Sequence, residues 1–443
     1  MANYKSLFLK AKKEGISELE ITVTESSEFS FSLFHNEIDN YSISDSFVLN
    51  ARGIYNGKIG YASSEKYDSE AIDFLIDHIK ENATLSTSED KPLFFPGSKS
   101  YKKKNVYNKK LDAVSNADKV AVVKKLDARV REKSKLIQEV ETSYSEAREE
   151  IVMMNTLGLN LKSKNNYAYV YCAALAVDEE GETKNGYDIK LFNDLDSLDI
   201  EKFSDKVVKK TLDQFGSKSC ASDKYKCVLS SETVSNLIRP YLSNLSSEEI
   251  QKNSSLMAGK LHQQIASEKL TVMENPLEKN VFFRYFDDEG VATSNKTLIK
   301  NGVLETYLYN LNTAAKDDVH STGNGYKSRG SNAIGIDMVN IKVKPGRLSE
   351  EGLIKKCKKG IYIDQVSGLH AGLNAQSGNF SLLAQGFLIE KGELGRPVTL
   401  ITAAGNLYKL FEDVQAVGNN LELHINGCEV PSLLIKEIAI SGE

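Results

Sequence analysis

The chain has 443 residues, of which 41% are hydrophobic and 26% are charged, and its formal net charge at pH 7 is -5. This length favours two or three domains, and the composition is typical of globular proteins. A mildly acidic chain without a recognisable nucleic-acid module argues against a general nucleic-acid binder.

The N-terminal stretch and the cysteines indicate in which cellular compartment the protein is expected. The stretch MANYKSLFLKAKKEGISE carries charges among its apolar residues, whereas a signal peptide needs an uninterrupted apolar run. No segment approaches the roughly 20 apolar residues of a membrane span. Five widely separated cysteines favour small buried side chains over a disulfide framework or a CxxC zinc site. We therefore expect a cytoplasmic protein with neither a membrane nor a nucleic acid as partner.

The first half alternates blocks of helical and strand patterns. In chain order, we first predict an amphipathic helix over about 2–14 ended by Gly15, strands over 19–64 with a hairpin turn at Asn56-Gly57, and a helix within 64–83 with Ile72, Leu75, Ile76 and Ile79 on one face. A loop with a basic run over 85–110 and a long helix within 115–135 follow. The last elements of this half are an antiparallel meander over 136–192, with turns at Gly158, Asn165-Asn166 and Asn185-Gly186, and a helix over 200–216. The basic run favours a solvated face over contact with an acidic partner.

The second half follows the polar stretch SKSCASDKYK, residues 217–226, where the chain has its natural break. Here the patterns predict a strand at 227–231, a helical stretch over 232–268, strand pairs turned at Asn301-Gly302 and Lys391-Gly392, and helices near 349–360 and 405–418. Strict βαβ alternation is absent. We therefore predict an α+β fold of two domains, 1–218 and 219–443, with antiparallel or mixed sheets and packed helices.

Catalytic motifs are scarce. None of the six histidines begins HExxH or HExxxH, which leaves only a metal site assembled from distant residues such as His262, His370, His424 and Cys428. There is no GxSxG elbow. The glycine-rich STGNGYKSRGSNAIG lacks the GK[ST] ending of a P-loop, so it is either an ordinary loop or a loop over a peptide or partner groove.

Three acids, Asp287, Asp288 and Glu289, stand directly before Gly290. Clustered carboxylates can hold calcium or magnesium, or raise one another's pKa. No alternating oxygen ligands follow as in an EF-hand, and the next residues run straight into a predicted strand. The sequence therefore favours a turn.

Several long blocks carry a family resemblance. YFDDEGVATSNKTLIKNGVLETYLYNLNTAAK, STGNG, GNFSLLAQGFLIEKGELGRPVTLITAAGNLYKLFEDVQAVGNNL and VPSLLI occur in this order, and the N-terminal strands contribute FSLFHNEIDNYSISDSFVLNARGIYNGKIGYASS. Together they closely resemble the TldD/PmbA family over nearly the whole chain. The family fold is the expected fold.

The resemblance has a consequence for zinc. TldD-like members resemble zinc metallopeptidases with an HExxxH helix and a C-terminal cysteine ligand, whereas PmbA/TldE-like members lack the helix motif. In this chain RPYLSN occupies that place, with Arg239, Pro240 and Asn244 at the motif positions and Cys428 near the cysteine position. An arginine offers a metal no lone pair. The resemblance therefore implies no catalytic or metal residue in this chain and zinc in a partner subunit only.

The implied function is that of a noncatalytic or degenerate subunit of a TldD/TldE-type zinc metallopeptidase that acts in the proteolysis and maturation of unfolded peptides. The implied partner is a TldD-like zinc subunit, or a second copy of this chain. The residues we expect at a peptide or partner groove are Asp287, Asp288, Glu289, Gly290, Gly323, Asn324, Asn379 and Phe380. Two alternatives stay open: an autonomous homodimeric peptide-binding protein without peptidase activity, and an enzyme with a metal site built from distant ligands. A DNA-directed role, associated with the family by name, finds no support in the composition.

Overall fold

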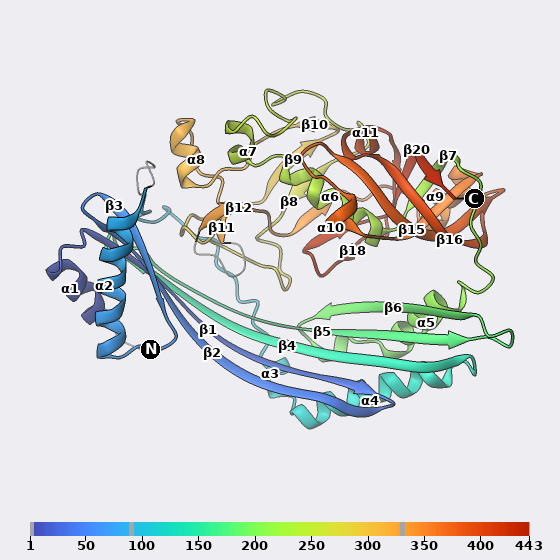
Figure 1. Ribbon diagram of the computed structural model, residues 1–443, viewed down its shortest axis with the longest axis horizontal. Coiled ribbons are helices and arrows are strands. Elements are labelled where there is room, and N and C mark those ends of the chain that lie inside the picture. Colours follow the sequence, from blue (N-terminus) through green and yellow to red (C-terminus); the bar gives the residue numbers. More distant parts are fainter. Residues whose placement is uncertain (1–3, 88–92, 328–332, 443) are drawn as a thin grey trace.

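The computed structural model of the chain describes residues 4–87, 93–327 and 333–442. A long arched sheet from the first half lies beneath the strand-rich second half (Figure 1). Within the described residues, no helix is long and apolar enough to cross a membrane. All five cysteines are buried and free, as predicted.

The first half forms one antiparallel six-stranded sheet in the order β3-β2-β1-β4-β5-β6. Its elements are α1 (Lys5–Lys13), β1 (Glu18–Phe34), β2 (Glu37–Tyr55), β3 (Lys58–Ser64), α2 (Ser69–Leu85), α3 (Lys109–Ala113), α4 (Asn116–Glu132), β4 (Ile137–Asn155), β5 (Asn160–Val177), β6 (Thr183–Phe192), the 3-10 turn η1 (Leu195–Ser197) and α5 (Ile200–Leu212). Strands β1, β2, β4 and β5 have 17 to 19 residues. At about 3.3 Å per residue, such strands extend roughly 55–60 Å.

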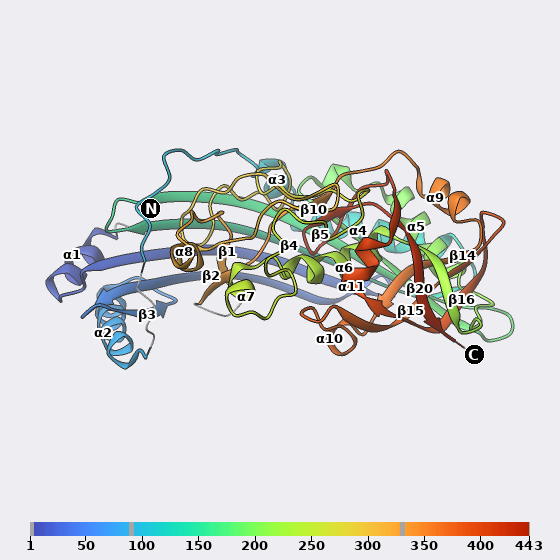
Figure 2. The ribbon, with the colours of Figure 1, turned by 90° about the horizontal axis from the view of Figure 1, so that it is seen from above.

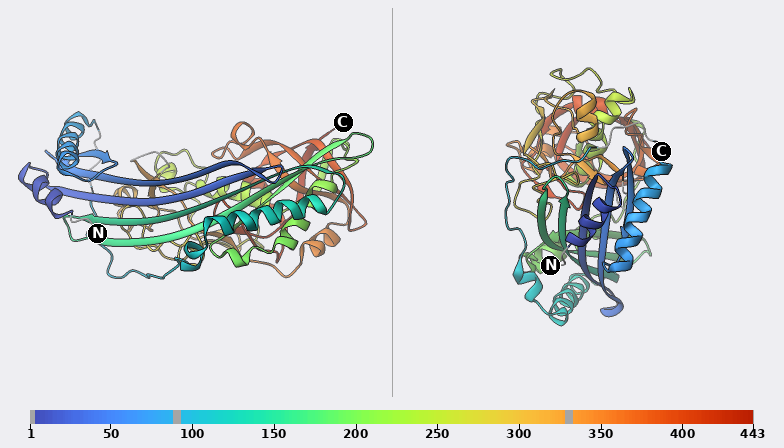
Figure 3. Two further views of the ribbon diagram at one scale, coloured as in Figure 1. Left: turned by 90° about the horizontal axis from the view of Figure 1, so that it is seen from below. Right: turned by 90° about the vertical axis from the view of Figure 1, so that its left-hand side faces the viewer.

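The two faces of the arched sheet differ because side chains alternate along each strand. In β1, Leu19, Ile21 and Val23 are buried with α1 and α2. Further along the same face, Phe29, Phe31 and Leu33 are buried with α4 and α5. Figure 3 (left) shows α2 and α4 near opposite ends of this underside. The other face of β1, which carries Thr22, Thr24, Ser26, Glu28, Ser30 and Ser32, looks toward the second half.

The second half contains two more six-stranded sheets and a two-stranded hairpin. Its elements are β7 (Asp223–Leu229), α6 (Ser231–Ser243), α7 (Ser247–Gln251), β8 (Val272–Glu274), β9 (Lys296–Lys300), β10 (Val303–Leu304), α8 (Leu311–Lys316), β11 (Gly325–Lys327), β12 (Ile334–Ile336), β13 (Ile341–Val343), α9 (Glu350–Cys357), β14 (Gly360–Ser367), α10 (Leu369–Gly372), β15 (Asn379–Glu390), β16 (Glu393–Asn406), α11 (Leu407–Glu412), β17 (Val414–Val417), β18 (Glu422–Leu423), β19 (Cys428–Val430) and β20 (Leu433–Ser441). One sheet has the order β10-β9-β8-β13-β19-β18 and the other β16-β15-β14-β7-β20-β17. Strand β16 also pairs with β20, which closes the latter sheet into a ring. Viewed from above, this half covers the sheet at the end away from α1 and α2 (Figure 2).

The α+β prediction with antiparallel and mixed sheets is confirmed, since β13–β19 and β14–β7 are parallel pairs in otherwise antiparallel sheets. The predicted hairpins at Asn56-Gly57, Asn301-Gly302 and Lys391-Gly392 are also present. Helix α2 begins at the Asp68 cap and buries Leu75, Ile76 and Ile79, with Ile72 partly buried beside them. The division into domains at about residue 218 stays a prediction.

Two of the predicted meander turns are wrong. The Gly158 turn joins β4 to β5, but Asn165-Asn166 lies inside β5 and Asn185-Gly186 lies inside β6. The Asn166 amide serves a tertiary contact, because it accepts from the Asn108 N–H at 2.8 Å and donates to the Asn108 carbonyl at 2.9 Å. Gly186 is required by close packing, because a Cβ there would lie 2.7 Å from the Lys210 carbonyl carbon in α5.

Two predicted helices are shorter than expected. The stretch 232–268 is helical only in α6 and α7, and the chain then turns through left-handed backbone at Asn253, Gly259 and His262, with φ of +54°, +71° and +62°. Left-handed residues end a right-handed helix. The stretch 405–418 contains α11 and then continues as β17, which pairs with β20.

A substitution at Gly60 should strongly weaken the contact between β3 and α2. A Cβ at Gly60 would lie 1.9 Å from the Ile79 carbonyl oxygen, so the helix would have to move. We expect Gly60→Ala to lower the free energy of unfolding by at least about 1–3 kcal/mol, the usual cost of overpacking, as measured by urea denaturation. Gly335→Ala is the control, because among the described residues no heavy atom would lie nearer than 3.9 Å to its Cβ. Equal midpoints for the two variants would contradict the prediction.

Candidate functional site

A cleft of about 900 Å³ lies between the polar face of the arched sheet and the second half. Glu28 of β1 and Tyr169 of β5 contribute to its sheet side. Arg239, Arg284, Asp288 and Tyr326 contribute from the second half. The cleft thus contains one residue of the RPYLSN stretch and one acid of the DDEG block, which are far apart in the sequence.

Arg239 cross-links three chain segments at the cleft. Its Nη1 donates to the Asn426 carbonyl at 3.1 Å, and its Nη2 donates to Asp337 Oδ1 at 2.7 Å and to the Met338 carbonyl at 3.1 Å. Cys428 lies beside the guanidinium, and burial raises the pKa of its thiol to about 11. A thiol with that pKa is protonated at neutral pH. Because metal ions bind the deprotonated thiolate, this side chain is a poor metal ligand in its protonated form.

The other two motif positions are equally unsuited to zinc. Pro240 lies inside α6, and Asn244 directs its amide nitrogen to the carbonyls of Pro240, Tyr241 and Ala375 at 3.2, 3.2 and 2.8 Å. At the positions where the resemblance puts two imidazoles and a carboxylate base, these residues offer a permanently charged guanidinium, a pyrrolidine ring and a donating amide. The residues present therefore do not fit a zinc ion.

The distant-ligand metal site considered from the sequence is not formed. Across 4–87, 93–327 and 333–442, no three histidine, cysteine, aspartate or glutamate side chains gather in a way that could hold a metal ion. His370 is exposed in α10, and the ring of His424 contacts Ser231 Oγ at 3.1 Å. Cys428 instead faces Arg239.

The three acids of the DDEG block have three different roles. Asp287 is fully buried and shapes the turn: its Oδ1 accepts the N–H of Glu289 and Val291 at 3.0 and 2.9 Å, and its Oδ2 accepts that of Gly325 at 2.9 Å. Asp288 lies in the cleft wall, where its carboxylate accepts from Arg284 Nη2 at 3.1 Å and from the Lys327 N–H at 2.8 Å. The predicted turn is therefore present.

The third acid, Glu289, is 5% exposed and accepts at 2.7 Å the N–H of Leu311, the first residue of α8. Burial raises its pKa to about 7. Burial, followed by the charge of Glu289, also raises the pKa of Asp287 well above its usual value.

The DDEG turn also joins the two halves of the chain. Tyr101 donates its hydroxyl to the Gly290 carbonyl at 2.7 Å, and Ser98 Oγ accepts the Ala292 N–H at 3.0 Å. Gly290 has a φ of +82°, and a Cβ there would lie 2.5 Å from Leu159 Cδ2. We call this contact, made by 287–292 with Ser98, Tyr101 and Leu159, the turn joint.

The remaining groove candidates lie in two places. Gly323 has a φ of +72°, and Asn324 is fully buried where its Nδ2 donates to both carboxylate oxygens of Glu274 at 2.9 and 3.0 Å. Asn379 and Phe380 begin β15, where Phe380 is 6% exposed and packs over Gly405. None of the four lines the cleft. Residues 328–332 of the glycine-rich stretch lie outside the described residues, and its flanks form the β11–β12 hairpin.

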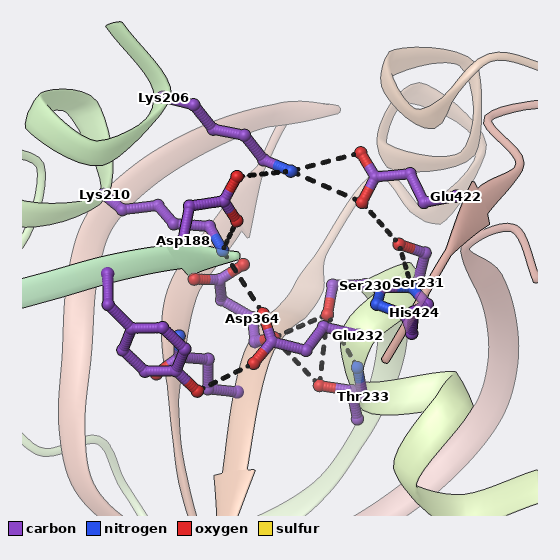
Figure 4. Close-up of polar contacts among 12 residues, drawn as sticks. Asp188, Lys206, Lys210, Ser230, Ser231, Glu232, Thr233, Asp364, Glu422 and His424 are labelled. Carbon is purple, nitrogen blue, oxygen red and sulfur yellow. Dashed lines mark hydrogen bonds and ion pairs between the residues drawn. The ribbon is translucent and has the colours of Figure 1, made fainter. Parts of the chain in front are cut away.

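A second joint, at the β6 edge of the sheet, is ionic (Figure 4). Lys210 Nζ of α5 lies 3.0 Å from Asp188 Oδ1 and 3.2 Å from Glu232 Oε2 of α6. Lys206 Nζ lies 3.3 Å from Asp188 Oδ2 and 3.3 Å from Glu422 Oε1. Tyr187 also donates its hydroxyl to Glu232 Oε1 at 3.0 Å. We call this group the lysine joint.

Burial and the neighbouring charges shift several pKa values at the lysine joint. Burial alone would lower the pKa of Lys210, but Asp188 and Glu232 outweigh it, so the pKa lies above its usual value. Burial raises the pKa of Asp364, on β14 nearby, to about 6, although Lys210 opposes the shift. Burial lowers the pKa of His424.

The cleft continues along the interface to the lysine joint. A hollow of about 500 Å³ shares Leu191, Ile425 and Asn426 with the cleft. A third hollow, of about 230 Å³, shares Lys206, Glu232 and Glu422 with the second. The three hollows therefore lie next to one another along the interface, and the ion-paired side chains of the lysine joint stand between the second and the third. We call the cleft and the second hollow together the groove.

Comparison with known proteins agrees with this architecture. Models of the PmbA/TldA metallopeptidase family match the chain three times: domain 1 over 19–83, the central domain over 109–215 and the C-terminal domain over 222–442. The chain belongs to the PmbA/TldD family. Membership ties it to proteolysis.

Relatives of this PmbA/TldD family chain span its whole length. It is 27% identical to a metalloprotease PmbA homolog from Buchnera aphidicola over 98% of this chain and 95% of that one. Its fold matches the crystal structure of TldE from Thermococcus kodakarensis with a TM-score of 0.91, 26% identity and 100% coverage of both chains. A putative modulator of a DNA gyrase from Thermotoga maritima matches with a TM-score of 0.91, 29% identity and 99% coverage of both.

The lysine joint was not foreseen from the sequence. Lys206 and Lys210 are spaced four apart on a predicted helix, which places them on one side, but this pattern is common on solvated helices. Their partners Glu232 and Glu422 come from distant segments with no local signal.

The raised pKa of Glu289 predicts a specific pH dependence in this family member. The folded chain titrates Glu289 near pH 7, against an ordinary value of 4.5. Between those values the folded state binds more protons than the unfolded state, so stability falls as pH rises through the window. We expect Glu289→Gln to gain stability over the wild type at pH 8 and to gain little at pH 4.5, by urea denaturation. A pH-independent difference would contradict this.

The lysine joint predicts unequal effects for two neighbouring lysines. Lys210→Gln removes the cation of the partly buried Glu232 and one of the two lysines beside the buried Asp188, which keeps Lys206. We expect a loss of about 1–3 kcal/mol of unfolding free energy, the usual cost of leaving a buried polar group without its partner. Lys209→Gln, on the same helix, removes a lysine whose side chain is 73% exposed and pairs with Asp213. Its effect should stay within about 0.5 kcal/mol. Similar thermal midpoints for both variants would show that the joint contributes nothing.

Proposed function

We propose that this chain is a peptide-holding subunit, itself non-hydrolytic, of a PmbA/TldD-type zinc metallopeptidase. The observation that carries the proposal is the Arg239 guanidinium at the cleft, bonded to Asp337, Met338 and Asn426 at the place where the resemblance puts HExxxH. A fixed positive charge there repels a cation. Hydrolysis would then be the task of a TldD-like partner that carries its own zinc.

The groove supports an unfolded peptide as the ligand. It consists of the cleft and one adjoining hollow along the interface, so an elongated ligand fits it better than a compact one. Its sheet side carries hydroxyls and carboxylates rather than a large apolar pocket, which suits recognition with little sequence preference. Asp288 is the one predicted groove residue that lies in the cleft wall.

The second candidate is an autonomous homodimeric peptide-binding protein. The same groove favours it, because peptide binding needs no zinc and no TldD-like chain. The two candidates differ in one outcome: only the subunit model predicts that this chain increases the peptidase activity of a zinc-bearing partner.

Reconstitution separates the two candidates. We expect the chain alone, purified without chelators or a histidine tag, to contain far less than one zinc per chain and to leave an unstructured peptide intact. Adding a TldD-like chain from the same organism should give cleavage faster than that chain achieves alone, as followed by mass spectrometry. One zinc per chain, the content of a single catalytic site, would overturn the non-hydrolytic assignment.

The control for reconstitution is a partner whose HExxxH glutamate is replaced by glutamine. It should still associate with this chain in size-exclusion chromatography, while cleavage disappears. Persistence of cleavage with this partner would place the chemistry in the present chain and contradict the proposal.

A further inference from the structure

The cleft contains an unusual concentration of unpaired polar atoms. Among the described residues, six buried side-chain nitrogen or oxygen atoms have no hydrogen-bond partner. Three of the six, Tyr326 OH, Asn340 Nδ2 and Asn165 Oδ1, belong to residues that line the cleft. Because a buried polar group without a partner is costly, three in one place call for an explanation.

The two asparagines are each anchored through one half of the amide. Asn340 Oδ1 accepts from Asn280 Nδ2 at 2.9 Å, which leaves its Nδ2 without a partner. Asn165 Nδ2 donates to the Val281 carbonyl at 2.6 Å, which leaves its Oδ1 without one. The anchoring bonds fix which atom of each amide is free: a donor on Asn340 and an acceptor on Asn165.

The tyrosine adds a second donor. Tyr326 is 7% exposed and its ring lies 5.6 Å from the Arg284 guanidinium carbon, which holds the ring in place. Burial raises the pKa of Tyr326 well above its usual value, so the hydroxyl keeps its proton. Asn340 is 3% exposed and has a φ of +54°, a backbone conformation that asparagine adopts more readily than most residues. All three positions are therefore held by their surroundings.

We propose that Asn340, Tyr326 and Asn165 bind the main chain of an extended peptide in the cleft. Asn340 Nδ2 and the Tyr326 hydroxyl donate to peptide carbonyl oxygens, and Asn165 Oδ1 accepts a peptide N–H. This inference rests on the proposed peptide-holding function and names the groups that perform it. Every residue of a peptide offers these same groups, so recognition by them is independent of sequence.

The three atoms are shielded from solvent, so peptide entry has to move the neighbouring side chains that cover them, while the three anchored side chains keep their positions. Rotamer changes of this kind are common when a pre-formed surface binds its ligand. The gain is that each unpaired group obtains the hydrogen bond it lacks in the free chain.

The decisive variant is Tyr326→Phe, which removes only the unpaired hydroxyl. We expect the free protein to keep or raise its thermal midpoint, while the Kd for an unstructured, fluorescently labelled twelve-residue peptide rises between about twofold and tenfold, the effect of one lost hydrogen bond. Tyr241→Phe is the matched control, because its buried hydroxyl already donates to the Ile265 carbonyl at 2.9 Å. That variant should lose stability and keep the same Kd.

A second probe tests whether the main chain is recognised. The same peptide with alternate amides N-methylated loses N–H groups but keeps its side chains. The wild type should bind the methylated peptide more weakly, and Asn165→Leu should reduce the difference between the two peptides.

The outcomes separate this inference from the function on which it rests. Failure of the wild-type chain to bind the unmodified peptide would overturn both. Wild-type binding that Tyr326→Phe and Asn340→Leu leave unchanged would overturn only the assignment of these residues. Equal binding of the methylated peptide would overturn main-chain recognition.

Discussion

The buried carboxylate of Asp287 is the constraint on which the rest of the site depends. It accepts three main-chain N–H groups from two chain segments, and so ties the DDEG turn to the start of the β11–β12 hairpin. That geometry directs Asp288 into the cleft wall toward Arg284 and Glu289 toward the start of α8. It also brings Gly290 against Leu159 and Tyr101, where only a residue without a side chain fits. The three acids, for which the sequence favours a turn, are therefore a structural centre whose middle residue, Asp288, lines the cleft.

The two joints hold the halves by opposite physical means. The turn joint contacts the first half through main-chain groups, hydroxyls and a packed glycine rather than through ion pairs. The lysine joint uses charges in which Lys206 and Lys210 each bridge the sheet to the second half. Because the two joints lie on either side of the cleft, they define its length, and the polar face of β1 remains uncovered by helices between them. The same sheet is thus an apolar support on its underside and a hydrogen-bonding surface above.

Local chemistry made much of the fold predictable. Asp68 and the Leu75, Ile76 and Ile79 stripe specify α2, and Asn56-Gly57 specifies a hairpin, because both signals act over a few residues. Predictions failed where a distant segment decided the outcome: Gly186 is small because α5 crosses it, and Asn166 is polar because it holds Asn108. In the site, the resemblance led to Arg239 and Asp288. No sequence pattern indicates that Asn165 Oδ1 and Asn340 Nδ2 lack hydrogen-bond partners. A missing hydrogen bond can be recognised only when the positions of all neighbouring atoms are known.

Attachment at both ends has a mechanical consequence. Two halves joined at one point could open by a hinge rotation about that point. Because these two halves are joined at two places, a rotation about either joint would break the contacts of the other. The cleft can widen only if the long antiparallel strands bend along their length. The hydrogen bonds between β1 and β4 and between β4 and β5 resist that bending. Under the proposed function, such a restriction would exclude a folded domain, which is too thick to enter, and would admit a single unfolded strand. Selection for unfolded chains would then come from the stiffness of the arch, before any side chain is recognised.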